Sequence, residues 1–140
     1  MTGGRGSLPG VNLQALQPLL LVGAGGFVGS VLRFLVSGWA QRIDPQGGFP
    51  YGTLAVNAIG CLVIGLLSGL ADARGVLGPE ARLLILVGVL GGFTTFSTFG
   101  YETLGLLRSG ATLPAAANVL LSVGLGLAAV WLGYGIGSTR

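Results

Sequence analysis

The amino-acid sequence predicts an all-α integral membrane protein that crosses the bilayer four times. Of its 140 residues, 51% are hydrophobic and 8% are charged, and the mean hydropathy is +0.84. The apolar residues gather into four segments of about 20 residues each, the length that an α-helix needs to cross the hydrocarbon core. We therefore expect a single four-helix membrane domain over residues 18–140, after a flexible, polar terminus over residues 1–17.

The four apolar segments follow one another with short polar connections between them. The first covers residues 19–40, and its apolar pattern continues beyond Arg33, too far for a cleaved signal peptide. The others cover residues 53–71, 83–107 and 113–136. The connections "QRIDPQGGFPYG", "DARGVLGPEAR" and "RSGAT" contain the glycines, prolines and charges that end membrane helices. An even number of crossings places both ends of the domain on one side of the membrane.

All seven basic residues are arginines, and they are scattered along the chain rather than clustered. The net charge of +3 therefore provides no basic patch for a nucleic acid, and we expect no such partner. The arginines outside the apolar segments divide between the side of the chain ends, with Arg5, Arg74, Arg82 and Arg140, and the opposite side, with Arg42 and Arg108. This weak bias under the positive-inside rule fits either one poorly signalled orientation or a chain that inserts both ways.

The side chains on which many enzymes and metal sites depend are scarce in this sequence. The chain has one cysteine, Cys61, and no histidine, which excludes an intramolecular disulfide, a histidine-based triad and a histidine-ligated metal. Cys61 lies in an apolar run, and we interpret it as a small packing residue. These absences argue against an enzyme.

Glycine accounts for 28 residues, and several glycines recur four positions apart within the apolar segments. The pairs are Gly25 with Gly29, Gly65 with Gly69, and Gly88 with Gly92. Small residues at this spacing let two helix backbones approach closely in lipid. We therefore expect tight helix packing, either within one chain or between subunits.

Three polar side chains lie inside the apolar segments. Arg33 either extends toward the nearer membrane surface or forms an electropositive vestibule that gathers anions. Glu102 either reaches the interface, joins a hydrogen-bond network or carries protons. Asn57 either joins helices through its amide or offers its NH2 donors to an anion in a pore. The sequence leaves these alternatives open.

The third apolar segment contains residues that a regular membrane helix disfavours. Gly91 and Gly92 are poor helix formers, and the residues after them carry hydroxyls that can satisfy freed backbone groups. These hydroxyls belong to Thr94, Thr95, Ser97 and Thr98. We therefore expect a helix broken near the bilayer midplane, which a membrane tolerates only where the backbone is buried in protein or lines water. Exposed carbonyls at such a break suit a small cation, whereas N–H groups and hydroxyls suit an anion.

Phe96 and Phe99 are three residues apart, so they share one face if the helix resumes after the break. The ordinary interpretation of two such phenylalanines is a packing pair. An aromatic ring is also positive around its edge, so it attracts an anion weakly. Weak attraction lets the ion leave again, as conduction requires.

Three blocks occur in order along the chain: "GGFVGSVLRF" at residues 25–34, "FPYGTLAVNAIG" at residues 49–60 and "GGFTTFSTF" at residues 91–99. Together they resemble the Fluc family of fluoride channels, also called CrcB, and the similarity covers residues 20–136. The resemblance implies an antiparallel homodimer with dual topology in the membrane lipid. It also implies two anion pores per dimer, each built from both subunits.

The resemblance further implies roles for individual residues. A structural sodium ion (Na+) is expected at the backbone carbonyls of Gly91 and Thr94. A basic vestibule residue is expected at Arg33. The residues expected to line the fluoride pore are Asn57, Phe96, Phe99, Ser97, Thr98 and Ser122. Ser122 is one turn from Asn118, and both can face a pore, although Asn118 stands where some members have an aromatic hydroxyl.

The function implied by the resemblance is passive export of cytoplasmic fluoride across the inner or plasma membrane, which confers fluoride resistance. Two other classes fit a small membrane protein of this composition. One is a dual-topology, proton-coupled exporter of small molecules with Glu102 as the carrier carboxylate. The other is a membrane scaffold that transports nothing.

Overall fold

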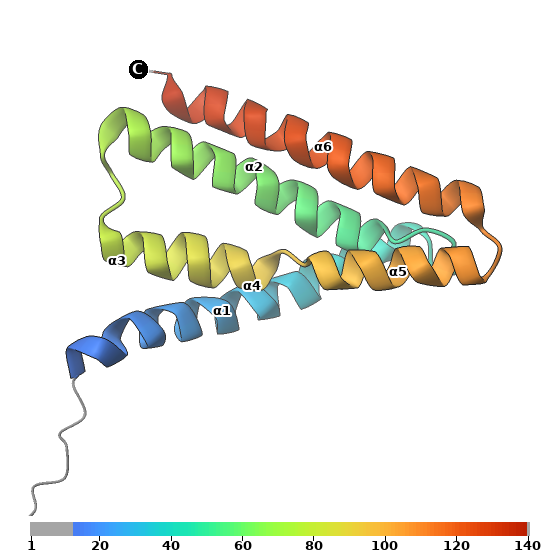
Figure 1. The fold of residues 1–140 in the computed structure, drawn as a ribbon, viewed down its shortest axis with the longest axis horizontal. Helices are drawn as coiled ribbons and strands as arrows, with labels where there is room; N and C mark the ends of the chain where they lie inside the picture. Colours follow the sequence, from blue (N-terminus) through green and yellow to red (C-terminus); the bar gives the residue numbers. More distant parts are fainter. Residues whose placement is uncertain (1–12, 140) are drawn as a thin grey trace, which may run out of the picture.

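A computed structural model describes residues 13–139 of the chain, and every regular element within them is helical. Four helical stretches of this part are long and apolar enough to cross a membrane, which confirms the predicted class and number of spans. Figure 1 shows these stretches running back and forth beside one another. The elements are α1 (Leu13–Ala40), η1 (Gln41–Ile43), α2 (Tyr51–Arg74), α3 (Pro79–Ala81), the π-helix η2 (Arg82–Leu90), α4 (Gly91–Phe93), α5 (Phe96–Arg108) and α6 (Thr112–Ser138).

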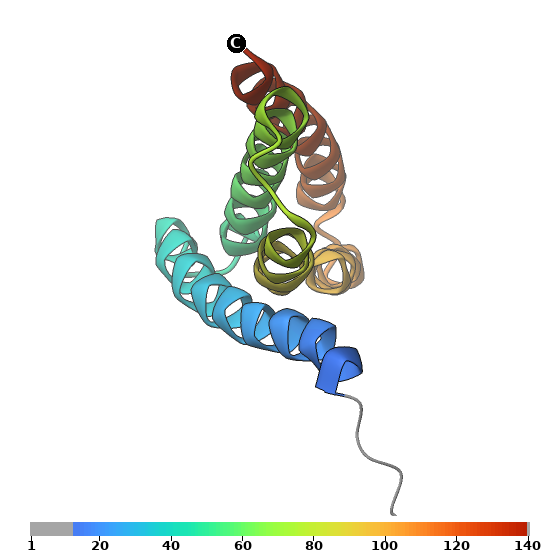
Figure 2. The ribbon, with the colours of Figure 1, turned by 90° about the vertical axis from the view of Figure 1, so that its left-hand side faces the viewer.

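The third span, from α3 to α5, lies between α1 on one side and the pair α2–α6 on the other (Figures 1 and 2). Helices α2 and α6 pack along most of their length, and α1 packs mainly against η2 and α4. Helix α1 begins and helix α6 ends at the same end of the bundle (Figure 1). The described part of the chain therefore has the even number of crossings that the sequence predicts.

The observed helices are longer than the apolar segments. Helix α1 begins at Leu13, so residues 13–17, which the sequence assigned to a flexible terminus, are helical. Residues 1–12 of that predicted terminus lie outside the described residues. Helix α2 continues to Arg74 and ends where Gly75 adopts a left-handed backbone with φ of 63°, its N–H bonded to the Ala71 carbonyl at 2.9 Å.

The glycines spaced four apart lie where helix backbones touch, as predicted. A side-chain carbon added at Gly25 or Gly29 of α1 would collide with the backbone of the third span. One added at Gly65 or Gly69 of α2 would collide with the backbone of α6. Lipid offers no hydrophobic drive for helices to associate, so this close backbone contact contributes much of their attraction.

We predict that Gly133→Ala destabilises the protein, because a Cβ at this position of α6 would lie 2.8 Å from the Leu66 backbone nitrogen. Overpacking of this kind typically costs about 1–3 kcal/mol. The matched control is Gly135→Ala on the same helix, where an added Cβ meets nothing within 4 Å. The measurement is the thermal unfolding midpoint of the purified protein in detergent. Equal midpoints for the two variants would contradict the proposed contact.

Candidate functional site

The third span leaves the helical conformation at Thr94 and Thr95, between α4 and α5 (Figure 1). Thr94 has φ −83° and ψ 156°, and Thr95 has φ −150° and ψ 118°, so both backbones are extended. The glycine pair before them is helical and belongs to α4. Gly92 packs against the Gly26 backbone of α1, so its small size serves helix packing rather than the change of direction.

Asn57 of α2 holds the extended backbone of Thr95 at both of its polar groups. The Thr95 N–H donates to Asn57 Oδ1 at 2.8 Å, and Asn57 Nδ2 donates to the Thr95 carbonyl at 3.0 Å. A primary amide has two N–H donors, so one N–H of Asn57 is left for another acceptor. Asn57 therefore joins two spans and also retains a donor.

The extended segment releases several carbonyls from helical hydrogen bonding, and those of Gly91 and Thr94 are among them. In a continuous helix the Gly91 carbonyl would accept from the Thr95 N–H, but that N–H donates to Asn57. The Thr94 carbonyl would accept from the Thr98 N–H, but that N–H donates to Thr95 Oγ1 at 3.3 Å. Backbone oxygens, including those of Gly91 and Thr94, thus become available near the middle of the span.

Thr95 also caps the first turn of α5 with its hydroxyl. Its Oγ1 accepts from the Thr98 N–H and donates to Thr98 Oγ1 at 3.0 Å, and Ser97 Oγ lies 3.3 Å away. By accepting from the Thr98 N–H, the Thr95 hydroxyl satisfies one of the backbone donors that lack a helical partner at the start of a helix. The cap gathers three hydroxyls at the positive end of the α5 dipole.

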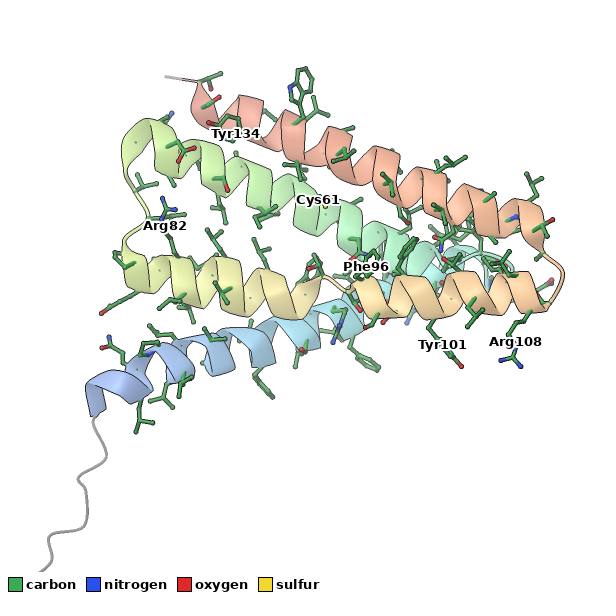
Figure 3. All side chains as sticks on the ribbon, viewed as in Figure 1. Cys61, Arg82, Phe96, Tyr101, Arg108 and Tyr134 are labelled. Carbon is green, nitrogen blue, oxygen red and sulfur yellow. The ribbon has the colours of Figure 1, made fainter. Side chains whose placement is uncertain are left out.

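The phenylalanines of α5 share a face, as predicted from their spacing. The ring centroids of Phe96 and Phe99 are 5.4 Å apart and the ring planes are tilted by 45°. Phe96 follows the extended segment directly (Figure 3), and 83% of its surface is exposed in the isolated chain. A ring this exposed contributes little to packing within one chain.

Two cavities meet at the extended segment, and Thr95 lines both. The first, of about 490 Å³, is lined by six of the predicted site residues, namely Asn57, Gly91, Thr94, Phe96, Phe99 and Ser122. The second, of about 570 Å³, is lined by Arg33 and Thr98 together with other polar residues of α1. Ser97 lines neither cavity. The structure thus gathers residues from α1, α2, α5 and α6 around one interruption.

Glu102 joins a hydrogen-bond pair inside the bundle. Its Oε1 accepts from the hydroxyl of Thr53, which is buried, at 2.9 Å, and its Oε2 is buried without a hydrogen-bond partner. Of the alternatives that the sequence left open for Glu102, the described contacts favour a network member. Thr53 had no assigned role in the sequence, because nothing along the chain links it to a residue 49 positions away.

Asn118 does not face either cavity, although the sequence suggested that it can face a pore with Ser122. It is 1% exposed and lies between α5 and α6, where its Nδ2 donates to the hydroxyl of Thr103 at 2.8 Å. Ser122 does line the first cavity, and its hydroxyl donates to Asn118 Oδ1 at 3.4 Å. The pairing of Asn118 with Thr103 was not visible in the sequence.

Comparison with known proteins identifies relatives over nearly the whole chain. The model of the family described as CrcB-like protein, Camphor Resistance (CrcB), matches residues 20–134. The fluoride-specific ion channel FluC of Methylobacillus flagellatus is 49% identical over 85% of this chain and 93% of its own. The proteins of the same name from Elusimicrobium minutum and Chlorobaculum tepidum are each 50% identical, over 87% and 86% of this chain and 94% of their own. These matches confirm the resemblance found in the three sequence blocks.

We predict that Asn57→Leu destabilises the protein, because it leaves both polar backbone groups of Thr95 without their partner. An unpaired buried polar group costs about 1–3 kcal/mol. The control is Ser122→Ala, which lines the same cavity and loses only one long hydrogen bond. Thermal unfolding of the purified variants measures the difference. A midpoint for Asn57→Leu equal to that of Ser122→Ala would show that the Asn57 bonds contribute nothing.

Proposed function

Because the chain belongs to the CrcB family, we propose that it is a fluoride-specific ion channel in a cellular membrane and not an enzyme. The observation that carries this conclusion is the near-complete match to relatives named as fluoride-specific ion channels, at 49–50% identity. The four apolar spans support a multi-pass protein of the inner or plasma membrane. The gathered donors around Thr95 supply the chemistry that such a channel needs.

Fluoride is small and holds its hydration water tightly, so a pore must replace that water with other donors. The remaining N–H of Asn57 and the hydroxyls of Thr98 and Ser122 are such donors, and all three residues line the two cavities. The positive edges of Phe96 and Phe99 add a weaker attraction that lets the ion leave. We infer that Arg33 gathers anions in the second cavity. A narrow passage of this kind rejects the larger chloride ion by size.

The proposed transport is passive. An inside-negative potential of 100 mV drives an anion outward with about 2.3 kcal/mol per charge. Hydrogen fluoride that enters a cell as a neutral acid dissociates there, and the channel releases the trapped anion. This outward flow confers fluoride resistance. The alternative of a proton-coupled exporter using Glu102 is not favoured, since the relatives are named as channels for this one ion.

We propose that the working protein is an antiparallel homodimer with dual topology. Phe96 supports this, because its ring borders a cavity yet stays largely exposed in one chain. A second copy seated over that cavity would complete a pore with residues of both subunits. The weak arginine bias between the two sides also fits a chain that inserts in both orientations.

We further propose a structural sodium ion at the extended segment. The carbonyls of Gly91 and Thr94 support it, since both lose their helical N–H partners and both residues line the first cavity. Backbone carbonyls replace the hydration shell of small cations in membrane channels. A bound sodium ion would add positive charge beside the anion path and tie the two copies together.

We predict that Phe96→Ile and Phe99→Ile each lower fluoride efflux from proteoliposomes by about tenfold, equivalent to about 1.4 kcal/mol. Isoleucine keeps an apolar surface but lacks the positive ring edge. Phe27→Ile is the matched control, because Phe27 of α1 is 73% exposed and lines neither cavity. A fluoride-selective electrode records the efflux. Unaltered efflux in both variants would remove the two rings from the conduction path.

We predict that replacing sodium by a bulky organic cation at constant ionic strength lowers the thermal unfolding midpoint and the dimer fraction. A ligand that binds only the folded state adds about 2.7 kcal/mol at a hundred times its Kd. Phe99→Ile is the control variant, since it leaves both carbonyls in place and should retain the sodium dependence. A midpoint that does not respond to the exchange would contradict the site at Gly91 and Thr94.

A further inference from the structure

A chain of three hydrogen bonds runs from α6 to the backbone of a pore phenylalanine. Ser122 Oγ donates to Asn118 Oδ1 at 3.4 Å, and Asn118 Nδ2 donates to Thr103 Oγ1 at 2.8 Å. Thr103 Oγ1 in turn donates to the Phe99 carbonyl at 2.7 Å. Both ends of this chain, Ser122 and Phe99, line the first cavity, whereas Asn118 and Thr103 do not.

The number of protons that each side chain can donate fixes the direction of these hydrogen bonds. The hydroxyl of Thr103 has one proton, and it is used on the Phe99 carbonyl. The rest of that oxygen can only accept, so Asn118 presents its NH2 group rather than its oxygen to Thr103. Its carbonyl oxygen then faces Ser122 and can only accept.

Helix α5 depends on few side-chain ties to its neighbours. Within residues 13–139, the Asn118–Thr103 bond is the one hydrogen bond that joins α5 to α6. In the same described part, α5 is also joined to α2 by the hydrogen bond from Thr53 to Glu102. Asn57 of α2 in addition binds the backbone of Thr95, just before α5 begins. The Asn118–Thr103 bond continues to the Phe99 carbonyl through the Thr103 hydroxyl. Asn118 is also among the most buried side chains, at 1% exposure.

We propose that Asn118 is a positioning residue for conduction, an inference that rests on the proposed function. Through Thr103 it holds the first two turns of α5, and with them the edge of the Phe99 ring, at a fixed angle to α6. Through its oxygen it holds the Ser122 hydroxyl by a long bond, which the hydroxyl can exchange for a passing anion. Asn118 thus prepares two groups of the path without touching the ion.

The test uses Thr103→Val, Asn118→Leu and the double variant, reconstituted in proteoliposomes. Thr103→Val keeps the shape of the side chain and removes its hydroxyl. We expect each single variant to lower fluoride efflux per folded protein by about tenfold. The double variant should be no slower than the slower single variant, because both changes break the same chain. Thr112→Val at the exposed start of α6 is the matched control and should conduct normally.

Rescue by a conservative variant separates positioning from packing. Thr103→Ser restores the hydroxyl but lacks the methyl group, so we expect it to recover most of the efflux that Thr103→Val loses. Even if Asn118→Leu does not fold, this pair of variants tests the Thr103 link through which Asn118 would act, and normal efflux in Thr103→Val would overturn the proposal. Variants that unfold at lower temperature but conduct normally per folded protein would overturn the proposal. Losses that multiply in the double variant, or no rescue by serine, would overturn it as well.

A second readout does not depend on fluoride flux. With 4-fluorophenylalanine at position 99, the fluorine NMR line should shift or broaden in Thr103→Val and return toward its original position in Thr103→Ser. An unchanged line in all variants would show that Phe99 is not positioned through Thr103. If the unaltered chain passes no fluoride, the proposed function fails, and this line still decides whether the Thr103 hydroxyl, through which Asn118 would act, positions the ring.

Discussion

The structure depends on the pairing between the Asn57 amide and the two polar backbone groups of Thr95. A break in a membrane helix is costly, because lipid cannot satisfy freed N–H and carbonyl groups. Asn57 removes that cost at Thr95 by taking the place of a neighbouring backbone. The same pairing deprives the Gly91 carbonyl of its helical partner. One side chain therefore both stabilises the interruption and exposes oxygen atoms within it.

The close helix packing brings the remaining groups to this interruption. Glycine contacts set α1 directly against the third span and α2 directly against α6. The hydroxyl cap of α5 and the ring pair then meet the cavity walls that α1, α2 and α6 provide. The elements are ordinary apolar helices. The glycines let their backbones pack closely, and this packing brings a few polar groups together around the interruption of the third span. This arrangement explains why a chain with so few charged residues suits the transport of an anion.

Much of the fold was predictable, because it follows from local patterns. The length of the apolar runs predicted four spans, the spacing of glycines predicted backbone contacts, and the three-residue spacing predicted the shared face of Phe96 and Phe99. The pairing of Asn57 with Thr95 joins residues 38 positions apart, so no periodicity encodes it. The same holds for Asn118 with Thr103, whose partner depends on how α5 and α6 meet. Ser97 lines neither cavity of the single chain, so its place in the pore stays a prediction.

The most direct test is the efflux of fluoride and of chloride from sealed liposomes that contain only this protein. We predict rapid release of fluoride down its gradient, without a proton gradient, while chloride stays inside. A narrow path with fixed donors passes the smallest halide and excludes the next. Liposomes that keep both ions, or that release both at equal rates, would contradict the claim that the interrupted third span forms a fluoride-selective path.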